Sequence, residues 1–429
     1  MDRQSEPQTQ RNRMTSVTYA SRALSRKSPA SEWGLLHAGF VATGIVTVLL
    51  GPILPTLAAH WSLDDKQAGF FFTAQFFGSL LGVFSTSFLL PRRGYAFVLA
   101  AGFAVMAAGV STLGHGPWTI GCLSVFSYGI GLGLIIPAGN LYVSSRAGDR
   151  SVAALSILNF AWSVGAVFCP LLVILVERRA GLRGFTVLLG GITALFALAF
   201  AMSPGLQAPA EGLSPQRPIA VWAGLLRRSH LSSLVALFFL YVGTENALGG
   251  WIASHAKRTG TALDSFWVLT PSVFWGSLLL GRALAPTAWR YLGSDKLARM
   301  ALAMAALGGL LILVAGSPMV ITISAGLAGL GLAPVFPILV AWLTETLGAD
   351  AHWAGGLMFG SAGLGGAVLP WLVGAVSTQA GSLRVGLGVP FLSCVLMLHL
   401  AGRRKPPQSA EPGPRNEFLP TAQQGPGVR

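Results

Sequence analysis

Long apolar stretches constrain the fold of this chain more than any other feature. A membrane-spanning helix needs about 20 mostly apolar residues. Only 10% of the 429 residues are charged, against about 25% in an average soluble domain. Because lipid offers no partner to backbone polar groups, each stretch must cross as an α-helix. We therefore expect an all-α membrane protein with twelve transmembrane helices, at residues 34–59, 68–90, 95–114, 118–143, 152–176, 184–203, 231–256, 266–289, 298–316, 318–343, 353–378 and 382–402.

The second six stretches repeat glycines and prolines of the first six at offsets of 198 to 200 residues. The matching pairs are Gly44/Gly243, Gly78/Gly276, Gly129/Gly329, Pro137/Pro337, Gly165/Gly365 and Pro170/Pro370. Because six is an even number, both halves enter the membrane from the same side. This is the parallel-repeat arrangement, in which the solute site lies between the repeats near mid-membrane. The Gly–Pro pairs of the fifth and eleventh stretches are either hinges or points of close packing.

Domain organisation follows from these repeats and the polar segments around them. We expect six-helix bundles at 34–203 and 231–402, joined by a proline-rich cytoplasmic linker at 204–230. The polar segments 1–33 and 403–429 are predicted to be disordered cytoplasmic tails. Residues 1–33 also lack the apolar core of a signal peptide.

The net charge of +14 comes from Lys and Arg in short clusters between the apolar stretches. With the N-terminus inside, the inner segments carry 21 of these residues and the outer loops carry 7. Positive residues are enriched on the cytoplasmic side, so we expect both termini in the cytoplasm and a multi-pass protein of the inner or plasma membrane. Three arginines at 178, 179 and 183 run against this bias. No basic soluble domain is present that would bind nucleic acid.

The few polar residues inside the stretches argue against an enzyme. Cys122, Cys169 and Cys394 lie in apolar runs without metal-ligand spacing. We find no Walker-type phosphate loop and no Ser-His-acid set. We therefore expect no catalytic residues, no metal and no cofactor. The expected state is a monomer whose partners are membrane lipids and a small solute, with protons as the hypothesised coupling ion.

Short motifs in five of the stretches carry a family resemblance. They are Gly131-Leu-Gly133 with Ala138-Gly-Asn140, Leu158-Asn159 with Gly165-Ala166, Tyr241-Val-Gly243-Thr-Glu245, Phe336-Pro337, and Gly355 through Pro370. Together with the six-helix repeat they resemble the major facilitator superfamily, and within it the fucose-permease-like sugar branch. The resemblance implies a sugar or polyol transporter that works by alternating access.

The sequence departs from that pattern in two places. The superfamily loop between helices two and three carries an Asp followed by Arg-x-Gly-Arg, whereas here Pro91 stands in place of the Asp and Arg92 and Arg93 follow. Fucose-type proton symporters also carry acids in helices one and four, whereas helix one here has none and Ile136 occupies the position in helix four. Arg92 and Arg93 remain candidate gating residues.

Glu245 is the carboxylate expected near the middle of a span. A charge at that depth costs about 2.5–3.5 kcal/mol on insertion scales, so it should face the bundle interior. Glu245 is either a proton-coupling group and solute acceptor, or a structural ion pair. Arg282 in the next span is one candidate partner. At 1.5 Å per residue the two differ in depth by roughly 8 Å, which favours a role for Arg282 at the cytoplasmic gate.

Amides and aromatic rings complete the candidate solute site. Asn140, Asn159 and Asn246 offer donors and acceptors to hydroxyl groups, or else bond between helices. Five rings could stack on a sugar face or serve only in packing: Trp162, Trp251, Trp275, Phe336 and Phe359.

These features predict a secondary transporter of a small polar solute, a sugar or polyol, with proton coupling through Glu245 as a hypothesis. Two alternatives stay open. One is an exporter of amphipathic compounds such as drugs, and the other is a non-transporting membrane sensor or scaffold.

Overall fold

A computed structural model describes residues 30–203, 206, 229–261, 267, 269–347 and 351–404. Among these residues every regular element is a helix. The predicted tails at 1–33 and 403–429 and the linker at 204–230 lie almost entirely outside the described residues. The proposed domain boundaries therefore stay predictions.

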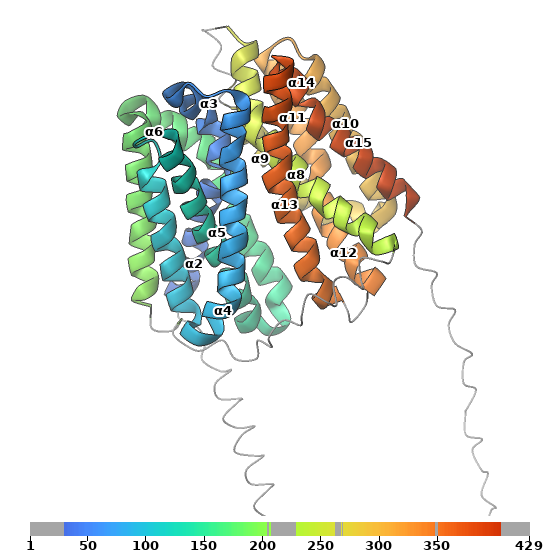
Figure 1. Cartoon of the computed structure of the whole chain (residues 1–429). Coiled ribbons are helices and arrows are strands. Elements are labelled where there is room, and N and C mark those ends of the chain that lie inside the picture. Colours follow the sequence, from blue (N-terminus) through green and yellow to red (C-terminus); the bar gives the residue numbers. More distant parts are fainter. Residues whose placement is uncertain are drawn as a thin grey trace, which may run out of the picture.

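Helices of the first half are α2 (Ala30–Val48), α3 (Leu50–Trp61), α4 (Asp65–Thr112), α5 (Trp118–Ala147), the short 3₁₀ turn η1 (Gly148–Arg150) and α6 (Ser151–Ala201). Helices of the second half are α8 (Ser229–Thr259), α9 (Thr270–Leu292), α10 (Ser294–Val314), α11 (Pro318–Leu332), α12 (Val335–Leu347), α13 (Ala351–Ala380), α14 (Leu383–Gly386) and α15 (Gly388–Arg403). The two halves stand side by side (Figure 1).

The labels α4 and α6 each cover two spans, which are joined by a tight turn into a helical hairpin. The backbone of α4 turns at Gly94 (φ 75°), and that of α6 turns at Gly181 (φ 68°). Glycine adopts such positive φ values without the steric cost that a side chain brings. In α4, Gly78 and Gly109 lie against neighbouring residues of α5, so the chain must reverse between them. The turns fall at the predicted loops between spans two and three and between five and six.

Two other spans are broken rather than joined. The first is divided between α2 and α3, which are bent by 44°. Pro52 lies just after this break and has no N–H to donate to the preceding turn. The tenth is divided between α11 and α12 around Pro334, with Pro337 one turn later. Proline therefore explains both breaks inside stretches that the sequence predicts as single helices.

Nine helices of the described chain are long and apolar enough to cross a membrane, or ten with the bent pair α2–α3 taken as one span. That count treats α4 once although it folds back at Gly94, and it omits α9, which carries Arg282 and Arg290. Counting both arms of α4 and adding α9 gives the twelve predicted spans. The all-α fold class is confirmed.

The internal repeat is visible in how glycines pack. A Cβ at Gly165 of α6 would lie 2.0 Å from the carbonyl oxygen of Val41 in α2. A Cβ at Gly365 of α13 would lie 1.9 Å from the carbonyl oxygen of Phe239 in α8. The offset of 200 residues therefore relates two equivalent helix crossings, where the lack of a side chain lets two backbones meet.

Four described chain ends lie on the lower side of the two halves in Figure 1, those of the first half at the bottom and those of the tilted second half at the lower right. Here α2 and α8 begin, and α6 and α15 end. We call this the termini end and the opposite one the distal end. Arg183, one of the arginines that oppose the charge bias, lies at the distal end and donates from Nε to the carbonyl oxygen of Gly114 at 3.2 Å. It thus ties the α4–α5 turn to α6.

Candidate functional site

An ion pair lies in the middle of the second half. Arg282 of α9 approaches Glu245 of α8 with 3.1 Å between Nη2 and Oε1. The same nitrogen lies 3.4 Å from the hydroxyl oxygen of Tyr241, one turn before Glu245. The side chain of Glu245 is 9% exposed and that of Arg282 is 32% exposed. The sequence left this pairing open and favoured a gate role for Arg282, because depth along straight helices separates the two residues.

The position of Arg282 on α9 directs it toward the first half. It follows Trp275 by seven residues, which is two helical turns along the same face. Trp275 itself meets Trp162 of α6 edge to face, with 6.1 Å between ring centroids. The side chain of Arg282 is partly open to solvent, although its guanidinium contacts Glu245 and Tyr241. The guanidinium therefore faces the space between the halves, while its charge is neutralised by Glu245.

A network of hydrogen bonds fixes the polar side chains that the first half contributes to the centre of the protein. Gln75 of α4 donates from Nε2 to the carbonyl oxygen of Thr47 at 2.9 Å and accepts from the hydroxyl of Tyr128 at 3.1 Å. Trp162 donates from Nε1 to the hydroxyl oxygen of Thr47 at 3.3 Å. Gln75 is 3% exposed. Its amide is thus fixed at both ends, which makes it a rigid wall of the site.

A small central pocket lies between this network and the second half. It is lined by Thr47, Val48, Leu50, Gly51, Phe72, Gln75, Asn246, Gly249, Gly250 and Trp275. Toward the distal end it is closed by Gly51 and Gly249, since a Cβ at Gly51 would lie 2.4 Å from the carbonyl oxygen of Gly249. The two halves touch through their backbones at this point. Asn246 and Trp275, both predicted site residues, therefore line one pocket with Gln75.

Asn140 and Asn159 form a second polar pair in the first half. Asn159 of α6 donates from Nδ2 to Oδ1 of Asn140 in α5 at 3.2 Å. Asn159 is exposed, and it precedes Ala166 and Pro170 by seven and eleven residues on the same helical face. Pro170 lines a pocket shared with α8 and α9 of the other half. Asn159 therefore faces the second half, nearer the termini end.

Apart from Trp162 and Trp275, the predicted aromatic residues lie on two sides of the centre. Phe336 and Phe359 pack together on the termini side, with 6.2 Å between centroids, and Phe336 lies 5.7 Å from Tyr241. Trp251 instead lies on the distal side and is 1% exposed. It donates from Nε1 to the carbonyl oxygen of Pro370 at 2.8 Å and so ties α8 to α13.

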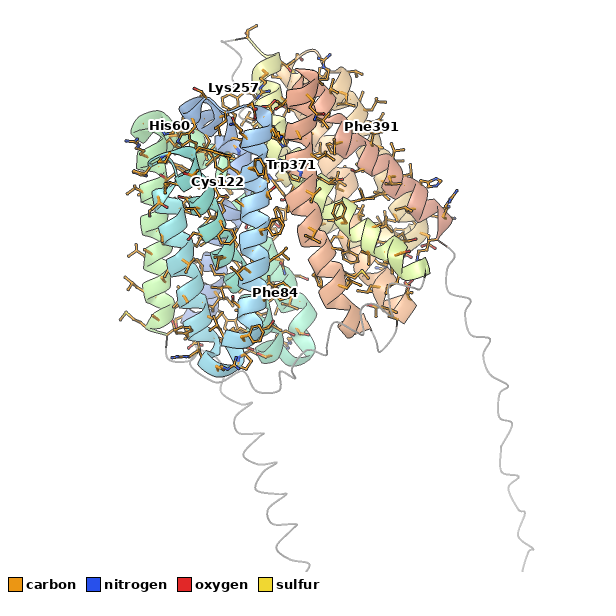
Figure 2. The ribbon with its side chains drawn as sticks, viewed as in Figure 1. His60, Phe84, Cys122, Lys257, Trp371 and Phe391 are labelled. Carbon is orange, nitrogen blue, oxygen red and sulfur yellow. The ribbon has the colours of Figure 1, made fainter. Side chains whose placement is uncertain are left out.

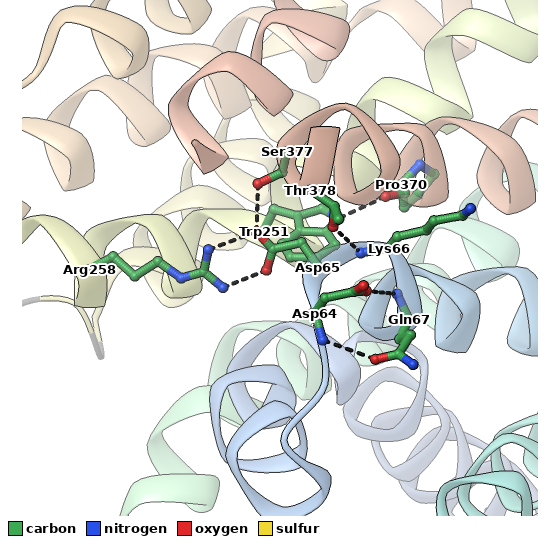
Figure 3. Close-up of polar contacts among 9 residues, drawn as sticks. All are labelled: Asp64, Asp65, Lys66, Gln67, Trp251, Arg258, Pro370, Ser377 and Thr378. Carbon is green, nitrogen blue, oxygen red and sulfur yellow. Dashed lines mark hydrogen bonds and ion pairs between the residues drawn. The ribbon is translucent and has the colours of Figure 1, made fainter. Parts of the chain in front are cut away.

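The distal end is closed by a polar contact that the sequence did not reveal (Figure 3). Asp65, the first residue of α4, receives both terminal nitrogens of Arg258 at the end of α8. The hydroxyl of Ser377 in α13 donates to the same carboxylate. The backbone N–H of Lys66 donates to the hydroxyl of Thr378 at 2.9 Å. One carboxylate of the first half thus holds two helices of the second.

The halves separate toward the termini end (Figures 1 and 2). Contacts between α4 and α13 run from Asp65 and Ser377 at the distal end to Leu80 and Gly363. One turn further, Phe84 of α4 and Phe359 of α13 are 53% and 54% exposed. Both lie on the helix faces that bear the contacts above them. The space between the halves is therefore open at the termini end and closed at the distal end.

Arg92 and Arg93, the other predicted gate residues, lie at the termini end of α4. Arg92 donates from Nη1 to the carbonyl oxygen of Phe88 at 2.9 Å, and Arg93 lies 5.4 Å from the ring centre of Phe97. Both partners belong to α4 itself. The gate role of Arg92 and Arg93 stays a prediction. It would apply to a state of the protein in which the termini end is closed.

Two six-helix halves around a polar centre, open at one end only, define a membrane transporter of the alternating-access class. Residues 36–291 match the Major Facilitator Superfamily, which is more than half of the chain. The chain belongs to that superfamily, as its motifs predicted. It is a secondary transporter and not an enzyme. Among the described residues, no three His, Cys, Asp or Glu side chains are grouped so that they could hold a metal ion.

Several named relatives and solved structures are similar over most of their length. The sodium-dependent glucose transporter 1A of Mus musculus is 24% identical over 392 residues, which cover 82% of this chain and 91% of the relative. The glucose/galactose transporter of Brucella abortus (strain 2308) is 25% identical over 369 residues, 80% of this chain and 86% of the relative.

Solved structures share the fold at lower sequence identity. The E. coli fucose:proton symporter superposes with a TM-score of 0.60 at 18% identity, over 88% of this chain and 100% of that one. A bacterial homologue of the human lysosomal transporter Spinster, in an inward-facing conformation, gives a TM-score of 0.71 at 13% identity, over 88% and 96%.

Proposed function

We propose that this protein carries a neutral sugar or polyol across the membrane by alternating access. The observation that carries the proposal is the central pocket between the halves, lined by the amides of Gln75 and Asn246 and the indole of Trp275. The neutralised pair of Glu245 and Arg282 begins one residue before Asn246 on α8. Amides and indole N–H groups suit hydroxyls, and flat rings suit the apolar faces of sugars. The relatives named as glucose and glucose/galactose transporters support the same solute class.

The charge balance of the site favours an uncharged solute. Glu245 and Arg282 cancel each other at 3.1 Å. The polar side chains that line the central pocket, those of Thr47, Gln75, Asn246 and Trp275, are uncharged. A charged solute would have to give up its hydration without a counter-charge, and that is costly in a site of low polarity.

We propose that both termini lie in the cytoplasm, so that the end open in this structure faces the cytoplasm. Orientation rests on the distribution of Lys and Arg. The Asp65–Arg258 contact then seals the extracellular side, while solute exchanges with the cytoplasm past Phe84 and Phe359. Rocking the halves about the Gly51–Gly249 contact reverses which end is open.

We further propose that Glu245 couples transport to protons. Protonation of Glu245 removes its charge and releases the Arg282 guanidinium to the space between the halves, where it can bond a solute hydroxyl. Solute affinity and proton binding are then linked through a single ion pair. Protons fit the site better than sodium, because the central pocket offers no cluster of oxygen ligands around a free carboxylate.

Uptake of labelled glucose into proteoliposomes tests both proposals. The wild-type protein is expected to take up glucose faster with a proton gradient, and Glu245→Gln is expected to lose that response while retaining glucose exchange without a gradient. A sodium gradient alone should have no effect. Equal responses to the proton gradient in wild type and Glu245→Gln would end the coupling role. Failure of wild type to move glucose, galactose or any polyol would end the sugar assignment.

A further inference from the structure

A buried donor without a partner marks one wall of the central pocket. Among the described residues six buried side-chain nitrogens or oxygens lack a hydrogen-bond partner, and of these only Nε1 of Trp275 belongs to a residue that lines this pocket. Trp275 is 5% exposed. Leaving a buried N–H unpaired costs about 1–3 kcal/mol, so a fold that keeps one at its solute site has another use for it.

The edge of the ring that bears this N–H lies against Gly249, a residue that lines the pocket. A Cβ built on Gly249 would lie 2.7 Å from Cζ2 and 3.2 Å from Cε2 of Trp275, and Cε2 is bonded to Nε1. Gly249 therefore packs directly against the indole edge, where any side chain would collide with the ring.

An acceptor without a donor lines the same pocket. Asn246 uses Nδ2 to donate to the carbonyl oxygen of Val242 at 2.8 Å, and among the described residues its Oδ1 accepts no hydrogen bond. The remaining polar groups are already paired. Gln75 is held at both ends, and the hydroxyl of Thr47 donates to the carbonyl oxygen of Thr43 and accepts from Trp162. One donor and one acceptor are thus left for a ligand.

We infer that a single hydroxyl of the solute binds here, accepting from Nε1 of Trp275 and donating to Oδ1 of Asn246. A hydroxyl is the sugar group that can do both at once. This inference rests on the proposed function and deepens it. The site selects its solute by one hydroxyl position, and Trp275 acts through its N–H and not only through its ring face.

Binding of glucose and its monodeoxy analogues to the purified full-length protein, measured by calorimetry, tests the inference. Wild type is expected to lose about tenfold in affinity for one analogue, the one that lacks the bound hydroxyl. Trp275→Phe keeps an aromatic ring and removes the N–H. It should lose about tenfold for glucose and bind that one analogue as well as wild type does.

Trp118→Phe is the matched control, because Nε1 of Trp118 is also buried and unpaired but lies at the start of α5, away from the pocket. It should bind all sugars as wild type does. Thermal melting of each variant establishes that it is folded. If Trp275→Phe retains the wild-type ranking of glucose over every analogue, the inference is overturned while the sugar assignment stands. If wild type binds no hexose or polyol, both are overturned.

Discussion

Replacing Asp65 by Asn should shift the protein toward the state that is open at the distal end. Asn removes the negative charge that Arg258 contacts with two nitrogens, and it keeps a side chain of the same shape. The exposed fractions of the Arg258 and Asp65 side chains are 49% and 12%. A fully exposed pair contributes about 0.2–1 kcal/mol, and the bidentate geometry and the Ser377 bond add to it. We expect a loss of about 1.4 kcal/mol, which is tenfold in the equilibrium between the two states.

Cysteine labelling reads out that equilibrium. Ala253 of α8 is fully buried and lines the pocket that α3, α6, α8 and α9 form at the distal end. Because Ala253 is fully buried, a cysteine there should react slowly with a membrane-impermeant maleimide in this state and faster when the halves separate at this end. The chain has only three cysteines to remove first: Cys122, Cys169 and Cys394. Asp65→Asn should raise the labelling rate of Ala253→Cys about tenfold in vesicles that expose the distal end.

Asp64→Asn is the matched control. Asp64 precedes Asp65, and its side chain accepts from the backbone N–H of Gln67 as the N-cap of α4. In Figure 3 the hydrogen bonds of Asp64 go to Gln67, which belongs to the first half. Asn caps helices about as well as Asp, so labelling should stay at the wild-type rate. Equal rates in the two variants would refute the role assigned to the Asp65 contact.

Other substitutions test the packing and the turns. Gly165→Ala places a Cβ 2.0 Å from the carbonyl oxygen of Val41 and should cost about 1–3 kcal/mol of stability, seen as a lower melting temperature in detergent. Gly191→Ala, where no atom lies within 4 Å, should be neutral or stabilising, and a similar loss in both would contradict the packing account. Gly94→Ala forces a side chain into φ 75° and should cost about 1–2 kcal/mol. An unchanged melting temperature of Gly94→Ala would contradict the claim that the turn in α4 requires a positive φ at this residue.

Much of the fold could be predicted because lipid leaves the backbone few choices. Apolar length located the spans, and the offset between Gly165 and Gly365 indicated the repeat, while the structure shows that both glycines lie at helix crossings. The breaks were harder to place. Pro52 and Pro334 lie in continuous apolar runs, so hydropathy alone predicts one unbroken helix across each of them. The bend arises because proline has no N–H to donate to the preceding turn.

The site was predictable in composition and less so in geometry. Glu245 stood out as a mid-span acid, and its proximity to Arg282 was one of two readings. Depth counted along ideal helices put the two residues apart, because that count ignores helix tilt and the length of an Arg side chain. The contact between Asp65 and Arg258 could not be predicted from the sequence, since the two residues lie at helix ends 193 residues apart. The pattern around either residue does not indicate its partner.

Distances between spin labels at the two ends test the central claim most directly. One pair, at Ser62 and Gln379, spans the halves at the distal end, and another, at Ser87 and Thr344, spans them at the termini end; all four residues are exposed. If the halves rock about the central contact, adding glucose should lengthen the distal distance and shorten the termini distance in the same sample. Distances that stay fixed, or that change in the same direction at both ends, would contradict alternating access through this site.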